Sequence, residues 1–302
     1  MSHFADRLLD RIDQIGAATC VGIDPVYARM PESLTADQPD PPNAQAVCEV
    51  FNDFAWRVLR GVADHAAAVK FQIACFERYH AHGIACLKTL MRHAQDIGFI
   101  VILDAKRGDI GSTADHYAAA WLEDTDADEH PLGVDALTVN PYMGPDTLDP
   151  LLATAQQSKR GLFALVRTSN PSSDALQSLA LADGRTVAQA LAWLVGEAGA
   201  GPHLVGRRGY SLLGAVVGAT KPDDIARLRK LMPQQIFLVP GYGAQGAAAD
   251  DLRPCFKSDG TGALVNASRS VIYAYEQSDT DDWLDAVHHA AANFHRDLAA
   301  IV

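Results

Sequence analysis

The chain has 302 residues and a formal net charge of −12, a length that suits either one large α/β barrel or two ordinary domains. The acidic balance argues against nucleic acid or an anionic membrane as a partner, because either would need a broad basic face. Five scattered cysteines without a C-x-x-C pair suggest neither a disulfide framework nor a zinc site, and the first residues lack an apolar signal core, so we expect a soluble cytoplasmic protein.

Stretches of helical spacing alternate along the chain with apolar, β-branched runs. The helical stretches lie at residues 1–15, 43–63, 77–95, 113–122, 147–157, 186–198, 222–231 and 280–298. The apolar runs predict strands at residues 18–23, 66–71, 99–103, 134–139, 162–166, 213–218, 235–239 and 263–266. This count predicts a closed (β/α)8 TIM barrel in a single domain, residues 1–302, whereas a doubly wound sheet usually has about five to seven strands. We expect the proline-rich stretch 25–43 to be a loop or lid and the acidic stretch 123–130 to be a surface loop.

The third apolar run ends in the pattern D-x-K-x-x-D, formed by Asp104, Lys106 and Asp109. Because the side chains of a strand alternate between its two faces, Asp104 and Lys106 point to the same side. We therefore expect a carboxylate and an ammonium together at the carboxyl end of this strand. Alone, the pattern is also typical of a solvated loop, so other residues must decide between the two interpretations.

Lys70 interrupts the second apolar run near its end. A lysine in a central strand is rarely buried without a partner, so we expect its ammonium to meet a carboxylate at the barrel mouth; a lysine on an edge strand, facing water, is the alternative. With Asp104, Lys106 and Asp109 it would form an alternating chain of charges, in which each carboxylate keeps its neighbouring ammonium protonated in a partly dry site. A lysine that stays charged is a proton donor and not a Schiff-base nucleophile.

Active sites of such barrels lie at the carboxyl ends of the strands, where this sequence collects further polar residues. They are Asp24, Asn140, Ser169, Gln245 and Arg269. The glycines of segment 240–246 let the backbone approach an anion closely, and a guanidinium can donate two parallel hydrogen bonds to phosphate, so we expect a phosphate site here. A mere tight turn is the alternative for the glycines. The eleven histidines are dispersed, and the sequence suggests no metal site.

With these residues assembled, the chain resembles the orotidine 5′-phosphate decarboxylases, in particular the longer bacterial subgroup of that family. The resemblance covers most of the chain and rests on motifs that follow one another in order. They are Gly22-Ile-Asp24, Val69-Lys-Phe-Gln72, Leu103-Asp-Ala-Lys-Arg-Gly-Asp-Ile-Gly-Ser-Thr113, Arg167-Thr-Ser-Asn-Pro171, Val216-Val-Gly-Ala-Thr220, Val239-Pro-Gly-Tyr-Gly-Ala-Gln-Gly246 and Asn266-Ala-Ser-Arg269. The resemblance implies a barrel homodimer that converts orotidine 5′-monophosphate (OMP) to uridine 5′-monophosphate (UMP) and carbon dioxide without a cofactor, as the last step of UMP synthesis.

The resemblance also implies a role for each matching residue. Asp24 and Lys70 would hold the ribose hydroxyls, Asp104 would face the substrate carboxylate, and Lys106 would protonate C6 as carbon dioxide leaves. The remaining matches would bind substrate or complete the partner's site: Asp109 and Thr113 across the dimer interface, Ser169 and its neighbour Asn170 at the pyrimidine amide, and Gln245 and Arg269 at the phosphate.

Three other functions fit parts of the pattern. A related magnesium-dependent decarboxylase of sugar-acid phosphates shares D-x-K-x-x-D, but segment 168–170 and Gln245 suit an amide-bearing ring. A Schiff-base aldolase would need Lys70 or Lys106 to be neutral. The third alternative is a non-catalytic nucleotide-binding barrel, against which the intact chain of charges argues.

Overall fold

The structure is a computed structural model that describes residues 2–124, 133–218, 222–242, 249–278, 280 and 282–301. Eight parallel strands pair each with the next, and the pairing of the last with the first closes a barrel. The strands are β1 (Thr19–Ile23), β2 (Ala68–Gln72), β3 (Ile100–Arg107), β4 (Ala136–Val139), β5 (Gly161–Arg167), β6 (Leu213–Val217), β7 (Phe237–Pro240) and β8 (Ala263–Ala267). Most of their residues are apolar, as expected of strands covered on both faces. The predicted (β/α)8 barrel is confirmed.

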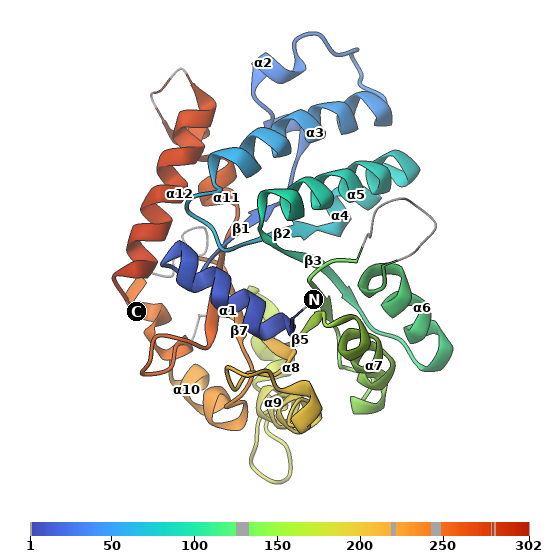
Figure 1. Ribbon diagram of the computed structural model, residues 1–302, viewed down its shortest axis with the longest axis vertical. Coiled ribbons are helices and arrows are strands. Elements are labelled where there is room, and N and C mark those ends of the chain that lie inside the picture. The colour runs from blue at the N-terminus through green and yellow to red at the C-terminus, as the bar shows by residue number, and fades with distance from the viewer. Residues whose placement is uncertain are drawn as a thin grey trace.

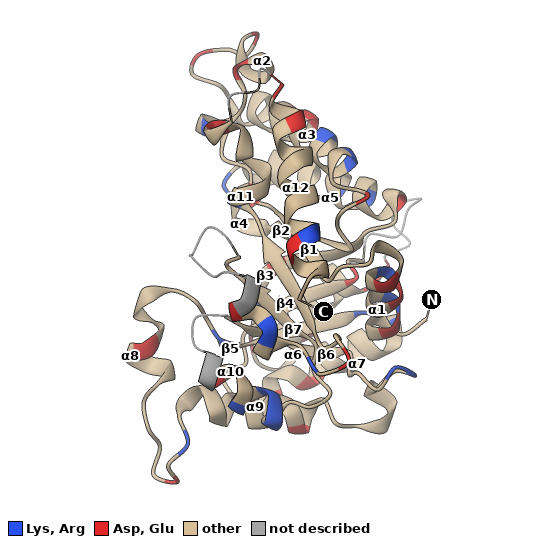
Figure 2. Ribbon diagram, turned by 90° about the vertical axis from the view of Figure 1, so that its left-hand side faces the viewer, with Lys and Arg blue, Asp and Glu red and all other residues tan. Residues whose placement is uncertain are grey.

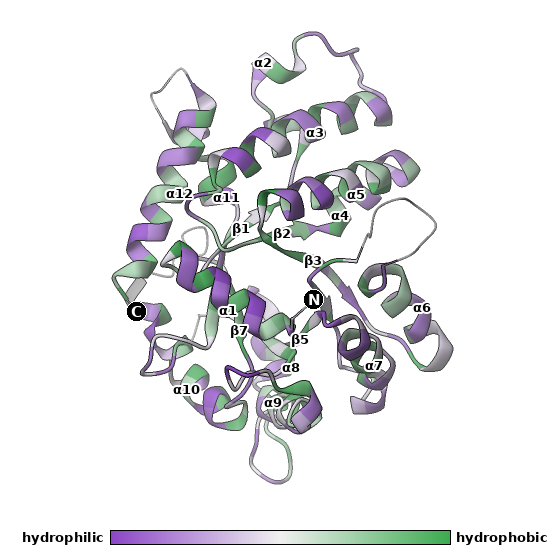
Figure 3. Cartoon of the chain, viewed as in Figure 1, coloured by the Kyte–Doolittle hydropathy of each residue, from purple (hydrophilic) through white to green (hydrophobic). Residues whose placement is uncertain are grey.

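Helices surround the barrel (Figure 1). The longer ones are α3 (Ala44–Gly61), α5 (His80–Ile97), α6 (Gly111–Leu122), α7 (Asp149–Ser158), α9 (Val187–Ala198), α10 (Pro222–Leu231) and α12 (Trp283–Ala299), and the short ones are α2 (Glu32–Thr35), α4 (Ile73–Glu77), α8 (Asp174–Gln177) and α11 (Arg269–Ile272). Their apolar residues pack against outward-facing strand residues such as Val69 and Leu103, and Figure 3 shows hydrophilic residues alternating with these along each helix. No helix in the described ranges is long and apolar enough to cross a membrane.

A smaller core fills the inside of the barrel and includes helix α1 (Phe4–Ile15). This helix lies across one end of the barrel (Figure 1), and Figure 2 shows it on the opposite side of the molecule from α8, which follows β5. Phe4 is 1% exposed and meets the ring of Phe163 edge to face, with the centroids 5.9 Å apart. A Cβ atom on Gly161 would lie 2.1 Å from Phe4, so this strand begins with a residue that has no side chain. The helix therefore closes the amino-terminal end of the barrel.

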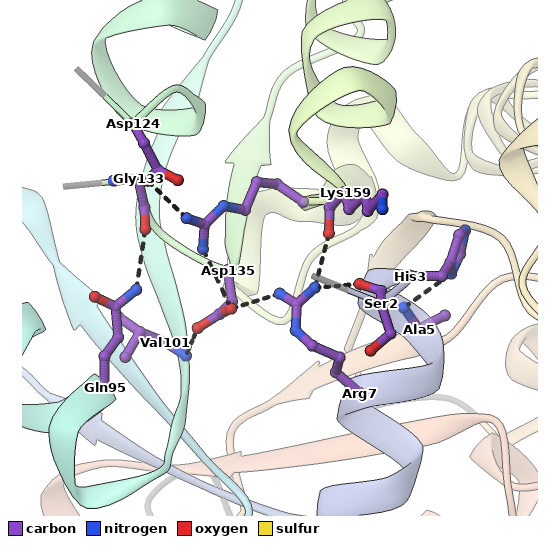
Figure 4. A network of polar contacts seen from close by, with 11 residues as sticks. Ser2, His3, Ala5, Arg7, Gln95, Val101, Asp124, Gly133, Asp135 and Lys159 are labelled. Carbon is purple, nitrogen blue, oxygen red and sulfur yellow. Dashed lines mark hydrogen bonds and ion pairs between the residues drawn. The ribbon is translucent and has the colours of Figure 1, made fainter. Parts of the chain in front are cut away.

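A polar network at the amino-terminal end of the barrel connects α1 to the strands (Figure 4). Arg7 donates hydrogen bonds to Asp135 Oδ1 at 2.5 Å and to the carbonyl oxygen of Lys159 at 2.9 Å. The other oxygen of Asp135 accepts the backbone N–H of Val101 at 3.0 Å, and Arg160 donates to Oδ1 at 3.4 Å. One aspartate thus connects α1, β3 and the segments that precede β4 and β5.

The structure differs from the predicted elements in several places. The helix predicted at 77–95 is α5, which begins only at His80, where φ is positive at 52°; the separate short helix α4 ends before it at Glu77. The predicted loop 25–43 contains a 3-10 turn at Tyr27–Arg29 and the short helix α2. Most of the predicted surface loop 123–130 lies outside the described residues.

Candidate active site

Side chains that point into the barrel change from apolar to polar toward the carboxyl ends of the strands. On β3, Ile102 belongs to the inner core and Asp104 follows two residues later; on β8, Leu264 is followed in the same way by Asn266. The period of two puts these pairs on the inner face. The polar half of the barrel is therefore the end opposite to α1.

The Asp104 carboxylate is the centre of a hydrogen-bonded cluster. Its Oδ2 accepts from Lys70 Nζ at 2.8 Å and from Gln72 Nε2 at 3.2 Å, and its Oδ1 accepts from Lys106 Nζ at 2.6 Å and from Thr138 Oγ1 at 2.9 Å. Lys70 is 5% exposed and Asp104 8% exposed, so the edge-strand interpretation of Lys70 is wrong. Both lysines predicted for the site thus meet one carboxylate.

Neighbouring charges keep the buried ions of this cluster ionised. Burial alone would lower the pKa of Lys70, but the negative charges of Asp24 and Asp104 and the hydrogen bond to Asp104 raise that pKa above its ordinary value. Burial would likewise raise the pKa of Asp104, yet the charges and hydrogen bonds of Lys70 and Lys106 hold it well below its ordinary range. We therefore expect Lys70 to carry its positive charge and Asp104 its negative charge at neutral pH.

Thr138 fixes the backbone that carries Lys106. Its Oγ1 accepts the N–H groups of Ala105 at 3.0 Å and Lys106 at 2.9 Å while it donates to Asp104. The register between β3 and β4 shifts over Leu103 to Arg107, and Lys106 has a positive φ of 50°. This unusual conformation needs such support, because a non-glycine residue rarely adopts it. The sequence analysis missed Thr138, although a lone hydroxyl in an apolar strand was the available signal.

A cavity of about 240 Å³ opens beside the cluster. Its apolar wall consists of Leu165, Val216, Leu238 and Pro240, and its polar wall consists of Lys70, Asp104, Lys106, Thr138, Thr168, Ser169, Asn170 and Asn266. The mixture of an apolar surface with a few convergent polar groups is typical of a small-molecule site. Five of the predicted residues therefore line one cavity: Lys70, Asp104, Lys106, Ser169 and Asn170. Asn266 also lines it and was not predicted, although the alternation of side chains along β8 places it on the inner face.

Asp24 follows β1 at the edge of this cluster and is half-buried. Ser268 Oγ donates a hydrogen bond of 2.6 Å to Asp24 Oδ2. Asp24 does not line the cavity itself, but it is close enough to Lys70 for its charge to raise the pKa of that lysine.

The residues predicted for the phosphate lie apart from the cavity or outside the described ranges. Arg269 begins α11, is exposed, and lines a different hollow of about 420 Å³ together with Arg29 and Tyr273. Gln245 lies outside the described residues. Arg269 comes directly after Ser268, and is thereby connected to the Asp24 side of the cluster.

Three predicted residues do not line the cavity. Asp109 is half-buried and its Oδ1 accepts the N–H of Ile110 at 2.9 Å, while Thr113 lies exposed in the first turn of α6. Asn140 is exposed and accepts the N–H of Tyr142 at 3.1 Å. Within the described ranges, no group of three His, Cys, Asp or Glu side chains is arranged to hold a metal ion.

The chain is similar to known proteins over nearly its whole length. Residues 19–280, which contain all eight strands, match the model of the orotidine 5′-phosphate decarboxylase / HUMPS family. The chain is 40% identical over 304 residues to an orotidine 5′-phosphate decarboxylase of Rhodopirellula baltica, with 99% of each chain covered. It is 34% identical over 307 residues to one of Caldicellulosiruptor bescii, with 100% of each covered. The structure is similar to that of Leishmania donovani OMP decarboxylase, with a TM-score of 0.75, 32% identity, and 100% of this chain and 98% of that chain covered.

Proposed function

This chain belongs to the orotidine 5′-phosphate decarboxylase / HUMPS family and is an enzyme that decarboxylates OMP in pyrimidine biosynthesis; we propose that it forms UMP in the last step of that pathway, with Lys106 as the proton donor and without a cofactor. The observation that carries the proposal is the cluster in which Asp104 joins Lys70 and Lys106 at the wall of the cavity.

In the proposed reaction the bond between C6 and its carboxylate breaks and the electron pair stays on C6. This ring carbon has no conjugated sink for the pair, so the site must stabilise negative charge electrostatically and deliver a proton promptly. Lys106 Nζ supplies both, because it is a cation whose position is fixed by a 2.6 Å hydrogen bond to Asp104 Oδ1. The proton moves from Nζ to C6 as carbon dioxide leaves, and Lys106 regains a proton from water.

Asp104 has a second proposed effect, which is to repel the substrate carboxylate. Two unit charges about 4 Å apart repel each other by about 4 kcal/mol at an effective dielectric constant of about 20. We assign the larger share of the acceleration to the fixed ammonium of Lys106, because a preorganised charge needs no rearrangement when the transition state forms.

The rest of the substrate is assigned to groups around the cluster. We propose that Asp24 and Lys70 hold the ribose hydroxyls, and that Ser169 and Asn170, on the cavity wall, bind the pyrimidine amide. Arg269 is assigned to the phosphate, with Gln245 as its predicted partner. An exposed guanidinium one residue beyond Ser268 supports this assignment, and binding of the remote phosphate would order the loops over the ring.

We also propose a homodimer in which Asp109 and Thr113 complete the partner's site. Neither residue lines the cavity of its own subunit. The loops beside them expose large apolar side chains, with Ile110 62%, Tyr142 74% and Met143 49% exposed, which suits a surface that a second copy covers.

The reaction class is tested by following the loss of OMP absorbance with and without a chelator and with and without borohydride. We expect turnover that neither reagent changes. Inhibition by the chelator would favour the magnesium-dependent decarboxylase, and inactivation by borohydride in the presence of substrate would favour a Schiff-base mechanism.

The role of Lys106 is tested by Lys106→Ala. We expect turnover to disappear while UMP still binds, because the substitution removes the proton donor and leaves the rest of the cavity in place. Lys230→Ala, on the exposed side of α10, is the matched control and should turn over like the wild type. A Lys106→Ala enzyme with a near wild-type rate would exclude Lys106 as the donor.

The shared site is tested by mixing two inactive variants, Lys106→Ala and Asp109→Ala. After random subunit exchange, up to about a quarter of the sites should combine an intact Lys106 with an intact Asp109 from the other subunit and recover activity. No recovery after exchange has been verified, for example with differently tagged subunits, would contradict the proposal.

A further inference from the structure

The two oxygens of the Asp24 carboxylate have different surroundings. Oδ2 accepts a hydrogen bond of 2.6 Å from Ser268 Oγ. Oδ1 is buried and accepts no hydrogen bond from the described part of the chain. A buried carboxylate oxygen without a donor is costly in free energy, so such atoms are typical of binding sites, where the ligand supplies the donor.

Ser268 can reach this carboxylate because residue 22 is a glycine. A Cβ atom on Gly22 would lie 2.8 Å from both Cβ and Oγ of Ser268, which is too close for any side chain. Ser268 Oγ also lies 3.2 Å from the carbonyl oxygen of Gly22, so the shorter contact, to Asp24, receives the hydroxyl proton. The pairing of β1 with β8, where Val21 lies opposite Ala267, holds both partners in place.

The backbone of Asp24 is held from the same side by Tyr273. Its hydroxyl donates to the carbonyl oxygen of Asp24 at 2.9 Å and accepts the N–H of Val26 at 2.8 Å. Tyr273 is 3% exposed, so this clamp is protected from water. Ser268 and Tyr273 flank α11, the helix that Arg269 begins, and together they connect Asp24 to that helix.

We propose that Ser268 and Tyr273 are positioning residues, which turn Asp24 Oδ1 toward a ribose hydroxyl of the bound nucleotide. The inference rests on the function proposed above and extends it, because neither side chain is itself assigned a contact with substrate. Ser268 occupies Oδ2 and leaves Oδ1 to accept the ligand's hydroxyl. A carboxylate held in this way distinguishes a ribose from a deoxyribose, because the missing hydroxyl leaves the buried Oδ1 atom without a donor.

The test measures affinities by calorimetry for three ligands: UMP and its analogues that lack the 2′ or the 3′ hydroxyl. The proteins compared are the wild type, Ser268→Ala, Asp24→Ala and the double variant. We expect Ser268→Ala to weaken UMP binding about tenfold, and to change binding of the analogue that lacks the recognised hydroxyl by less than about twofold, as loss of one oriented hydrogen bond predicts. In the Asp24→Ala background, Ser268→Ala should have no further effect, because Ser268 acts through Asp24.

A second variant tests the same inference without altering Ser268. Tyr273→Phe keeps the buried ring and removes only the hydroxyl, and we expect it to reduce the preference for UMP over the same analogue. Ser178→Ala is the matched control, because Ser178, an exposed residue that directly follows α8, also donates through Oγ to an aspartate, Asp174, at 2.8 Å. It should leave all three affinities unchanged.

Three results would overturn the inference: equal weakening of UMP and both analogues by Ser268→Ala, additive effects of Ser268→Ala and Asp24→Ala, or an unchanged preference in Tyr273→Phe. Each would reduce Ser268 and Tyr273 to supports of the fold. A wild-type protein that neither binds UMP nor consumes OMP would contradict the proposed function instead, so the two failures are distinguishable.

Discussion

At the scale of single residues, Thr138 connects the backbone of Lys106 to the charge of Asp104. Thr138→Val removes the hydrogen bond to Asp104 and both acceptor contacts to the backbone. We expect kcat to fall by about tenfold to a hundredfold with little change in KM, because a buried hydrogen bond to a charged group contributes about 1.5–3 kcal/mol. Thr138→Ser keeps the hydroxyl and should restore most of kcat in steady-state assays. A valine variant with wild-type kcat would show that Lys106 holds its position without this support.

The ion cluster predicts how stability depends on pH. Asp104 has a depressed pKa in the folded state, so its contribution is complete above the ordinary Asp pKa of 3.8 and is lost as the pH falls through that value and below. Lys70 has a raised pKa, so its contribution is complete below 10.5 and is lost at higher pH. We expect Asp104→Asn to cost about 3 kcal/mol in urea unfolding at pH 7, because it leaves a buried ammonium without its counterion. This difference from the wild type should shrink below about pH 4; a difference that stays constant down to pH 3 would contradict the pairing.

The cysteines are predicted to be unreactive in the folded protein. Burial raises the pKa of Cys20, Cys86 and Cys255 to about 12 and that of Cys75 to about 11, so few thiolates exist at neutral pH. We expect iodoacetamide at pH 8 to label the native protein far more slowly than the unfolded one, and intact-mass spectrometry measures the labelling. Rapid labelling of Cys20, beside Lys70, would show that this side of the barrel opens.

At the scale of elements, the spacing of apolar residues was sufficient to predict the strands but not the exact residues at which elements begin and end. Each predicted strand overlaps an observed one. The third strand extends beyond the apolar run to Arg107, because Thr138 on β4 supplies hydrogen bonds that no pattern within 99–107 reveals. The helix predicted at 77–95 begins only at His80, and it packs so closely on α4 that a Cβ on Gly83 would lie 1.8 Å from the carbonyl oxygen of Phe76. Such contacts between turns are invisible to spacing rules.

The same contrast holds for the site. Alternation along one strand correctly predicted that Asp104 and Lys106 lie together, and the cost of an unpaired buried charge correctly predicted a carboxylate for Lys70. Sequence could not predict that Arg269 lines a different hollow, because that depends on the direction in which α11 leaves β8. The roles of the individual residues remain predictions that the variants above test.

Helix α1 gives a prediction for stability without an effect on catalysis. Phe4→Ala removes a buried ring from the inner core and should cost about 3–5 kcal/mol in urea unfolding. The folded fraction should keep its wild-type kcat, because α1 lies at the end of the barrel opposite to the cavity. Phe294→Ala, in the outer core, is a control of similar size that leaves α1 intact. A loss of kcat in folded Phe4→Ala would show that α1 influences the site.

At the scale of the whole molecule, the exposed loops after β3 and β4 predict the assembly. Ile110→Asp places a charge on the apolar surface proposed for the dimer, so we expect a monomer in sedimentation equilibrium and a loss of activity along with it. Trp56→Asp, at a partly exposed position on α3, is the control and should leave the assembly unchanged. A dimer that persists in Ile110→Asp would place the interface elsewhere.

The four charged side chains that one subunit brings together in and beside the cavity have one more consequence. Two cations, Lys70 and Lys106, balance two anions, Asp24 and Asp104, so this group of four carries no net charge. A reactant that carries a fixed anion into it leaves the pocket with an uncompensated charge. Carbon dioxide leaves without a charge, and Lys106 then takes up one proton from water. The net charge of the four side chains is thereby zero again, as it was before the substrate bound, and the next turnover can begin.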